Sequence, residues 1–183
     1  MTTNKAVVVF ESMFGNTEKL SREVGDGLAS DGWQVVLADV RHVRPEDLAG
    51  CRLLVLGAPT HAFTLSRPST RADAVRQGAP ESRAELGVRE WLTSLDVLFP
   101  VVGARPSVAV FDTRADRAQH WPGSAARKTA RVLRSHGFPV LDRPVSFYVK
   151  DVKGPLVDGE RERARAWSQH LLELLRAETA RSA

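Results

Sequence analysis

Residues 6–17 read Ala-Val-Val-Val-Phe-Glu-Ser-Met-Phe-Gly-Asn-Thr, and this stretch decides the fold. It opens on five apolar residues in a row, a pattern typical of a strand buried on both faces of a parallel sheet. A polar loop over residues 11–17 follows, and the spacing of Leu20, Val24 and Leu28 then predicts an amphipathic helix. We therefore expect a buried strand, a short loop and a helix at the start of the chain.

The same alternation of short apolar runs and amphipathic segments continues along the chain. The apolar runs predict five strands, at residues 6–10, 34–38, 53–57, 107–111 and 138–141, the last resuming at 145–149. Helical spacing predicts helices around residues 20–28, 88–95, 126–133 and 164–175, with one or two turns at 45–48 and a loop-like or weakly helical segment at 66–86. This order predicts an α/β fold, a three-layer sandwich around a five-stranded parallel sheet.

Length and composition limit the alternatives. A chain of 183 residues predicts one domain, which we expect over residues 1–177 with a frayed tail at 178–183. No apolar run is long enough for a membrane span, and the lone Cys51 excludes an intramolecular disulfide, so we expect a cytoplasmic protein. The net charge of +4 comes without any nucleic-acid-binding motif, and no nucleic acid partner is expected.

The loop at residues 11–17 is the first candidate ligand site. Ligands of open α/β sheets bind beyond the carboxyl ends of the strands, and here the following helix directs its free N–H groups at the loop. Ser12, Asn16 and Thr17 offer hydroxyl and amide groups, and Gly15 permits close approach of the backbone. This predicts a phosphate site that needs no Lys or Arg. The alternative is that these side chains only cap the helix.

The six residues of this loop resemble a known family. Ser12-Met13-Phe14-Gly15-Asn16-Thr17 matches the pattern Ser/Thr-x-x-Gly-x-Thr, the FMN-phosphate loop of flavodoxins and flavodoxin-like domains. The resemblance implies the strand order 2-1-3-4-5 of a short-chain flavodoxin and FMN as the cofactor. It also implies that all six residues contact FMN.

The resemblance implies two further cofactor-binding loops. In the family, the loop after the third strand lies along the flavin ring, and the loop after the fourth strand holds the pyrimidine edge. The residues at these places are Pro59, Thr60, His61, Ala62 and Phe63 in the first loop, and Asp112, Thr113, Arg114, Trp121 and Gly123 in the second. Trp121 is expected to stack on the flavin. The alternatives are a core Phe63, an exposed His61 and a Trp121 that covers a helix end.

The chain departs from electron-carrier flavodoxins in two respects. Those proteins are strongly acidic, whereas this chain has a positive net charge and Arg67, Arg71, Arg114 and Arg117 in or beside the candidate loops. Positive charge near the ring predicts a less reducing flavin. In addition, residues 58–67 contain no glycine, so a positive φ in that loop is unfavourable.

These observations favour an FMN-binding protein that acts in electron transfer. It is either a carrier that docks on a redox partner protein or a small FMN-dependent oxidoreductase with an acceptor such as a quinone and NAD(P)H as the possible donor. The alternative from another class is a flavodoxin-fold scaffold or regulatory module that holds no flavin. We identify no catalytic side chain and no metal site in the sequence.

Overall fold

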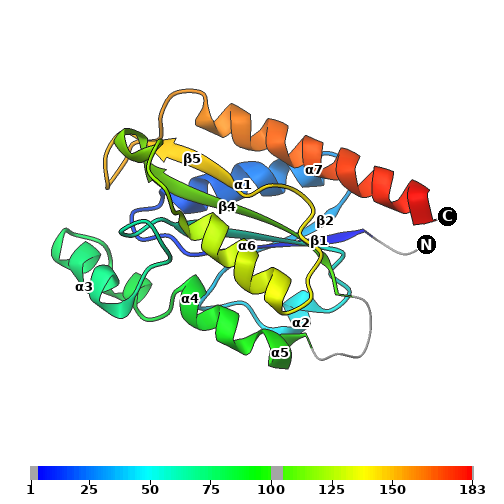
Figure 1. Cartoon of the computed structure of the whole chain (residues 1–183), viewed down its shortest axis with the longest axis horizontal. Coiled ribbons are helices and arrows are strands. Elements are labelled where there is room, and N and C mark those ends of the chain that lie inside the picture. The colour runs from blue at the N-terminus through cyan, green and yellow to red at the C-terminus, as the bar shows by residue number, and fades with distance from the viewer. Residues whose placement is uncertain (1–3, 100–104, 183) are drawn as a thin grey trace.

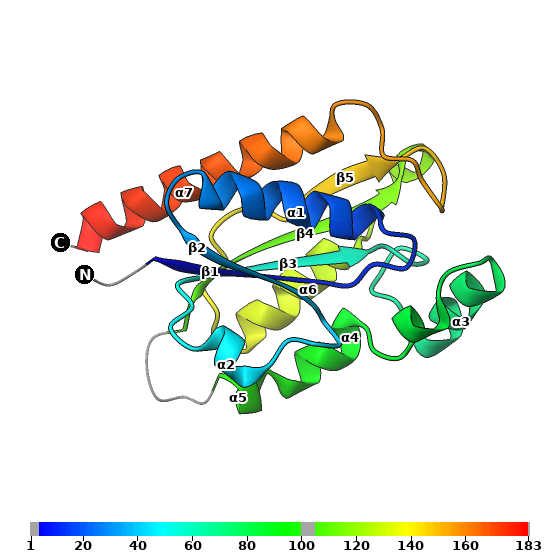
Figure 2. The same ribbon diagram turned by 180° about the vertical axis from the view of Figure 1, so that it is seen from behind.

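The computed structural model describes residues 4–99 and 105–182. Its strands form one parallel sheet in the order β2-β1-β3-β4-β5, with helices on both faces (Figure 1, Figure 2). The expected α/β class and strand order are confirmed. The strands are β1 (Lys5–Phe10), β2 (Gln34–Asp39), β3 (Leu53–Pro59), β4 (Ser107–Ala115) and β5 (Val145–Val149).

The continuous apolar runs arise because both faces of the sheet are covered. Ala6 and Val8 of β1 pack under α1 (Asn16–Ala29) and α7 (Glu160–Ser182), whereas Val7 and Val9 belong to the core on the other face. That second face is covered by short helices and one longer helix. They are α2 (Pro45–Leu48), α4 (Val88–Trp91), η2 (Leu92–Ser94), α5 (Leu95–Leu98) and α6 (Ala125–Ser135).

Three boundaries differ from the sequence prediction. The run at 138–141 forms no strand, because Pro139 lacks a donor, and Val140 makes only an isolated bridge to Val108. Strand β4 continues to Ala115, so residues 112–114 belong to a strand rather than to a loop. Both neighbours of β4 extend far enough to pair with these residues. The last helix runs to Ser182, where we expected fraying after residue 177.

The segment 66–87 agrees with the prediction of a loop-like or weakly helical stretch, since its longest helix begins at Pro68 and ends before Gly78. It contains α3 (Pro68–Arg76) and the single turn η1 (Glu81–Ala84), and we call it the α3 segment. Met13, in the loop after β1, packs with Ala74 and Ala79 in a small apolar cluster of its own. The α3 segment therefore lies against the loop that we expect to bind phosphate.

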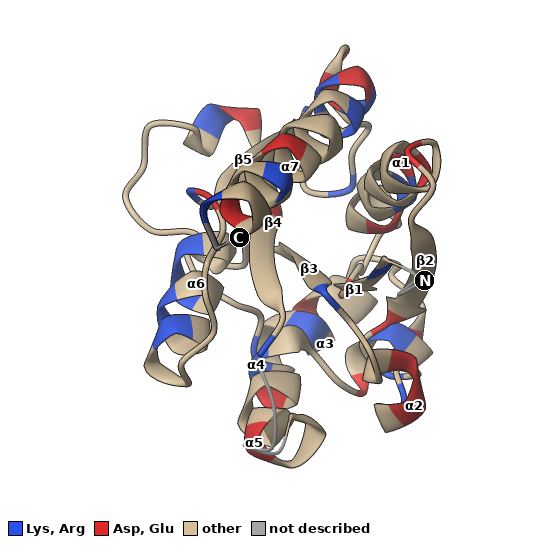
Figure 3. Cartoon of the chain, turned by 90° about the vertical axis from the view of Figure 1, so that its right-hand side faces the viewer, with Lys and Arg blue, Asp and Glu red and all other residues tan. Residues whose placement is uncertain are grey.

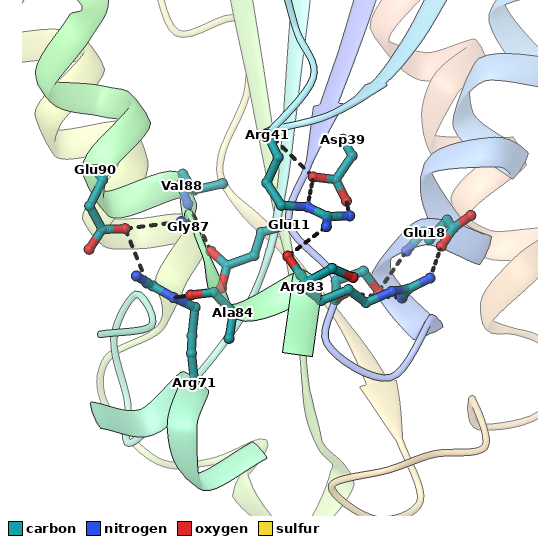
Figure 4. Close-up of polar contacts among 12 residues, drawn as sticks. Glu11, Glu18, Asp39, Arg41, Arg71, Arg83, Ala84, Gly87, Val88 and Glu90 are labelled. Carbon is teal, nitrogen blue, oxygen red and sulfur yellow. Dashed lines mark hydrogen bonds and ion pairs between the residues drawn. The ribbon is translucent and has the colours of Figure 1, made fainter. Parts of the chain in front are cut away.

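One buried arginine holds the α3 segment in place. The Arg71 side chain is 2% exposed; its Nε donates to the carbonyl of Ala84 (3.0 Å) and its Nη1 to the hydroxyl of Ser66 (2.9 Å). The same Nη1 lies 3.1 Å from Oε2 of Glu90 (Figure 4). These contacts join both ends of the α3 segment to the start of the α4 region.

Glu11 links this cluster to the end of β1. Its Oε2 accepts a hydrogen bond from the N–H of Val88 (2.8 Å), as Figure 4 shows, while Oε1 has no partner in the described part of the chain. Burial raises the pKa of this carboxyl above its ordinary value, although Ser66, Val88 and Arg71 act in the other direction. The carboxyl is therefore a structural contact beneath the loop rather than a ligand of the cavity above it.

Candidate functional site

A cavity of about 240 Å³ lies at the carboxyl ends of strands β1, β3, β4 and β5. This is where open α/β sheets bind their ligands. Side chains from all three predicted loops line it. They are Ser12, Met13, Phe14, Asn16 and Thr17 from the first loop, Pro59, Thr60, His61 and Ala62 from the second, and Thr113 and Arg114 from β4.

The loop before α1 has the features of an anion site. Gly15 adopts a positive φ of 87°, which turns the chain into the helix. In the described residues, the backbone N–H groups of residues 13–17 have no recorded acceptor. The Ser12 hydroxyl accepts a hydrogen bond from the N–H of Glu18 (3.3 Å) and keeps its own hydrogen to donate. Free amides at a helix N-terminus fit a phosphate group.

Two threonine hydroxyls meet beneath this loop. Thr17 and Thr113 are both buried, and their Oγ1 atoms lie 2.8 Å apart. One of the two hydroxyl hydrogens makes this contact, so the other remains available to a ligand in the cavity. The pair joins α1 to β4 and brings together residues 96 positions apart in the sequence.

The Asn16 side chain has a different partner from the one that we expected. Its Nδ2 donates to the carbonyl of Lys153 (3.0 Å), in the connector between β5 and α7. Gly154 packs so closely on Asn16 that a Cβ there would lie 2.7 Å from Oδ1. The amide side chain therefore holds the connector against the loop.

The loop after β3 forms a tight turn with strained geometry. His61 and Thr64 exchange two backbone hydrogen bonds (2.9 and 3.1 Å), and the two residues between them, Ala62 and Phe63, have φ values of 45° and 66°. Positive φ at non-glycine residues is unfavourable, so the surrounding contacts must maintain this conformation. The sequence argument that this loop avoids positive φ is wrong for these two residues.

The aromatic side chains of the two flavin loops contact each other. The rings of Phe63 and Trp121 lie 4.8 Å apart between centroids, and both side chains are exposed. Gly123 lies so close to Phe63 that a Cβ would come within 2.8 Å of its carbonyl oxygen. These three residues support the strained turn and do not line the cavity. Their contact with a flavin stays a prediction.

Asp112 has a structural role at the start of α6. It is fully buried in β4; its Oδ2 accepts hydrogen bonds from the Thr60 hydroxyl (3.0 Å) and from the N–H of Ala126 (2.8 Å). The Thr60 oxygen in turn accepts from the N–H of Ala125 (2.9 Å). A carboxylate at a helix N-terminus stabilises the helix. Asp112 thus positions Thr60. Thr60 lines the cavity, whereas Asp112 does not.

Arg114 is a buried cation at the cavity wall. Its side chain donates through Nη2 to the carbonyls of Ala118 and Trp121, the latter at 3.1 Å. Its Nε is buried without a partner, and no ion pair to a carboxylate is recorded for it in the described residues. By contrast, Arg71 lies beside Glu90 and Arg117 beside Asp151. Arg114 is therefore the arginine that places uncompensated positive charge at the cavity.

Sequence reasoning missed the wall formed by the α3 segment. The further lining residues are Thr70, Asp73 and Ala74 of α3, Gln77 just after it, and Ala115, Val149 and Val152. Arg83 of η1 also reaches the first loop; it donates to the carbonyl of Ser12 (3.1 Å) and to Glu18 (2.8 Å), as Figure 4 shows. The long connection between β3 and β4 could have indicated this wall, because long connections often contribute to functional sites.

His61 should make stability depend on pH. Burial, with a further contribution from the charge of Arg71, lowers the pKa of His61 from 6.5 to about 4. The imidazole is therefore neutral in the folded protein at pH 7, and stability should fall as the pH drops from 6.5 to about 4, because the unfolded chain binds the proton first. We expect a loss of about 2–3 kcal/mol over that window.

The His61→Gln variant should lack this component. Urea unfolding at pH 7.5 and 4.5 measures the difference between the two proteins at each pH. Equal pH dependence in the wild type and the variant would show that the imidazole remains solvated in the folded chain.

The strand order and the flanking helices are those of the flavodoxin-like fold. The Flavodoxin family model matches residues 8–66, which include β1, the candidate phosphate loop and β3. A search of curated proteins found no match to the chain. The resemblance seen in the sequence is thereby confirmed.

Solved structures extend this likeness over nearly the whole chain. Flavodoxin 1 from Bacillus cereus superposes with a TM-score of 0.65 at 16% identity, covering 93% of this chain and 98% of that chain. The rubredoxin oxygen:oxidoreductase of Desulfovibrio gigas has a TM-score of 0.67 at 19% identity, covering 97% of this chain and 37% of that one. The flavodiiron protein of Giardia intestinalis has a TM-score of 0.61 at 19% identity, covering 98% and 38%. This chain thus spans little more than a third of the last two proteins.

Two other kinds of site were sought in residues 4–99 and 105–182. No helix there combines the length and apolar character needed to cross a bilayer. The same residues contain no group of three or more His, Cys, Asp or Glu side chains placed to hold a metal ion.

Proposed function

We propose that this chain binds FMN without a covalent bond and acts in electron transfer, with a redox partner protein or a small acceptor such as a quinone. NAD(P)H is the possible donor. The free amides of residues 13–17 above the Thr17–Thr113 pair carry this proposal, because unpaired N–H groups at a helix N-terminus fit a phosphate. The proposed location is the cytoplasm, which suits the lone Cys51.

Each part of the cavity has a role in this proposal. The amides of residues 13–17 and the available threonine hydroxyl bind the phosphate. The turn at residues 61–64 and the wall of α3 exclude water from the two sides of the ring, and Arg114 supplies positive charge beside it. FMN, when bound, supplies the capacity to accept and release electrons, while the protein supplies binding, orientation and electrostatics.

A flavin-free scaffold is the second candidate function. The cavity of about 240 Å³ is smaller than most ligand pockets, which run from about 300 Å³ upward, and the Asn16 side chain is already engaged with Lys153. Because the cavity is small, the proposed electron transfer requires that part of FMN extend out of it toward the exposed rim. Purification of a colourless protein that cannot be loaded with FMN would favour the scaffold.

Titration of the flavin-free protein with FMN, followed by flavin fluorescence, tests the proposal. Thr17→Val removes one hydroxyl of the buried pair, and we expect FMN affinity to fall by about 1–3 kcal/mol, or roughly 5- to 150-fold. Riboflavin, which lacks the phosphate, should bind the two proteins with similar affinity. Thr93→Val, at an exposed threonine of η2, is the matched control. An unchanged FMN affinity in Thr17→Val would place the phosphate elsewhere.

A further inference from the structure

Helix α6 carries the whole excess of positive charge. The chain has 26 basic and 22 acidic residues, and α6 contains four basic residues and no acidic one, so the rest of the chain has 22 of each. Figure 3 shows blue bands along α6, without red. The four residues are Arg127, Lys128, Arg131 and Arg134.

These four side chains lack the ion pairs that many, though not all, of the other basic residues make. Across the described residues, Arg161 and Arg165 of α7 both pair with Glu23, and Arg176 pairs with Asp31. No ion pair is recorded there for any of the four α6 residues. The apolar side of α6 is buried in the core, so the basic side chains lie on its outer side.

The arrangement is unfavourable for the helix itself. Arg127 and Arg131 are four residues apart, and Arg131 and Arg134 are three apart, so like charges are neighbours on one side of the helix. Arg127 and Lys128 also lie near the N-terminus, where the helix dipole disfavours cations. Arg134, in the last turn, is favourable for the helix dipole, whereas Arg127 and Lys128 are not, so the helix does not explain all four charges.

The basic side of α6 adjoins the exposed aromatic pair at the site. Trp121, 54% exposed, precedes the helix by four residues and contacts the ring of Phe63, 42% exposed, at a tilted angle. The first N–H of the helix donates to Thr60, which lines the cavity. We call these two aromatic and four basic side chains the α6 surface.

We propose that the α6 surface docks a small acidic electron-transfer protein. Exposed aromatic residues flanked by arginine are the composition of protein–protein interfaces, and complementary charge speeds encounter. A membrane-bound helix would instead show apolar side chains beside its cations, but those of α6 are buried. Docking there would bring the partner to the cavity rim. Electron transfer to the docked partner rests on the proposed function, whereas the docking itself does not.

Isothermal titration calorimetry with a purified acidic [2Fe–2S] ferredoxin tests the docking. Both FMN-loaded and flavin-free protein are titrated, so a failure to bind FMN leaves the docking test intact. We expect binding at 20 mM NaCl that weakens at least tenfold at 200 mM. The double variant Arg127→Glu/Arg131→Glu should weaken binding at least tenfold, and so should Trp121→Ala.

The control variant Lys19→Glu/Arg181→Glu makes the same change in net charge at exposed positions of α1 and α7. It should bind the ferredoxin as the wild type does. Absence of ferredoxin binding, or equal losses in the control and α6 variants, would overturn the proposal. So would tighter binding of a 20-base-pair DNA duplex or of phosphatidylserine vesicles through the same α6 residues.

Discussion

Arg71→Met should lower the free energy of unfolding by about 3–5 kcal/mol, the range for breaking a buried charge pair by removing one partner. The guanidinium is 2% exposed and bonds to Ser66, Ala84 and Glu90, all of which would lose a donor. Because α3 forms one wall of the cavity, we also expect FMN affinity to fall about tenfold. Urea unfolding and FMN titration measure the two effects.

Arg76→Met is the matched control on the same helix. Arg76 is exposed, and its one recorded ion pair among residues 4–99 and 105–182 is with Asp73, so the change should stay within about 0.5 kcal/mol. Similar stability of the two variants would show that the buried contacts of Arg71 do not hold the α3 segment. Hydrogen exchange in residues 66–87 should also increase in Arg71→Met and remain unchanged in Arg76→Met.

Arg114→Met should make the bound flavin more reducing. Reduction adds negative charge, which a nearby cation stabilises; two unit charges about 6–10 Å apart at an effective dielectric constant of 20 interact by about 2–3 kcal/mol. For a two-electron couple this corresponds to a midpoint potential lower by about 40–60 mV. Spectroelectrochemical titration of the FMN-loaded proteins measures the shift.

Arg117→Met is the control that distinguishes the potential shift caused by Arg114 from one caused by any loss of a positive charge. Arg117 lies three residues further along the chain, just after β4, but is exposed and beside Asp151, so its removal should shift the potential by much less. A potential that is unchanged or higher in Arg114→Met would contradict the role of Arg114. The sequence offered four arginines that could raise the flavin potential. Of these, Arg114 is the one we select, because the other three are exposed or lie beside carboxylates.

Much of the site follows from local sequence. The loop Ser12–Thr17 was identified because the pattern of hydroxyls and glycine lies between a buried strand and a helix, and those elements follow from short-range periodicity. The contacts that Asp112, Phe63 and Trp121 make within the protein were not predicted, because each depends on a partner distant in the sequence. Asp112 accepts a hydrogen bond from Thr60, and the ring of Trp121 contacts that of Phe63. Such pairs cannot be read from one strand or one loop.

The sequence alone determined the architecture and the place of the site. Apolar runs with period two and stripes with period 3.6 specify buried strands and covering helices, and parallel strands put their loops at one edge. Only the tertiary structure decided which side chains meet there. The α3 segment has weak local signals, and its position depends on Arg71, whose partners span residues 66–90. Likewise, Thr17 and Thr113 become neighbours only when the sheet forms, since their contact depends on the folding of the whole chain.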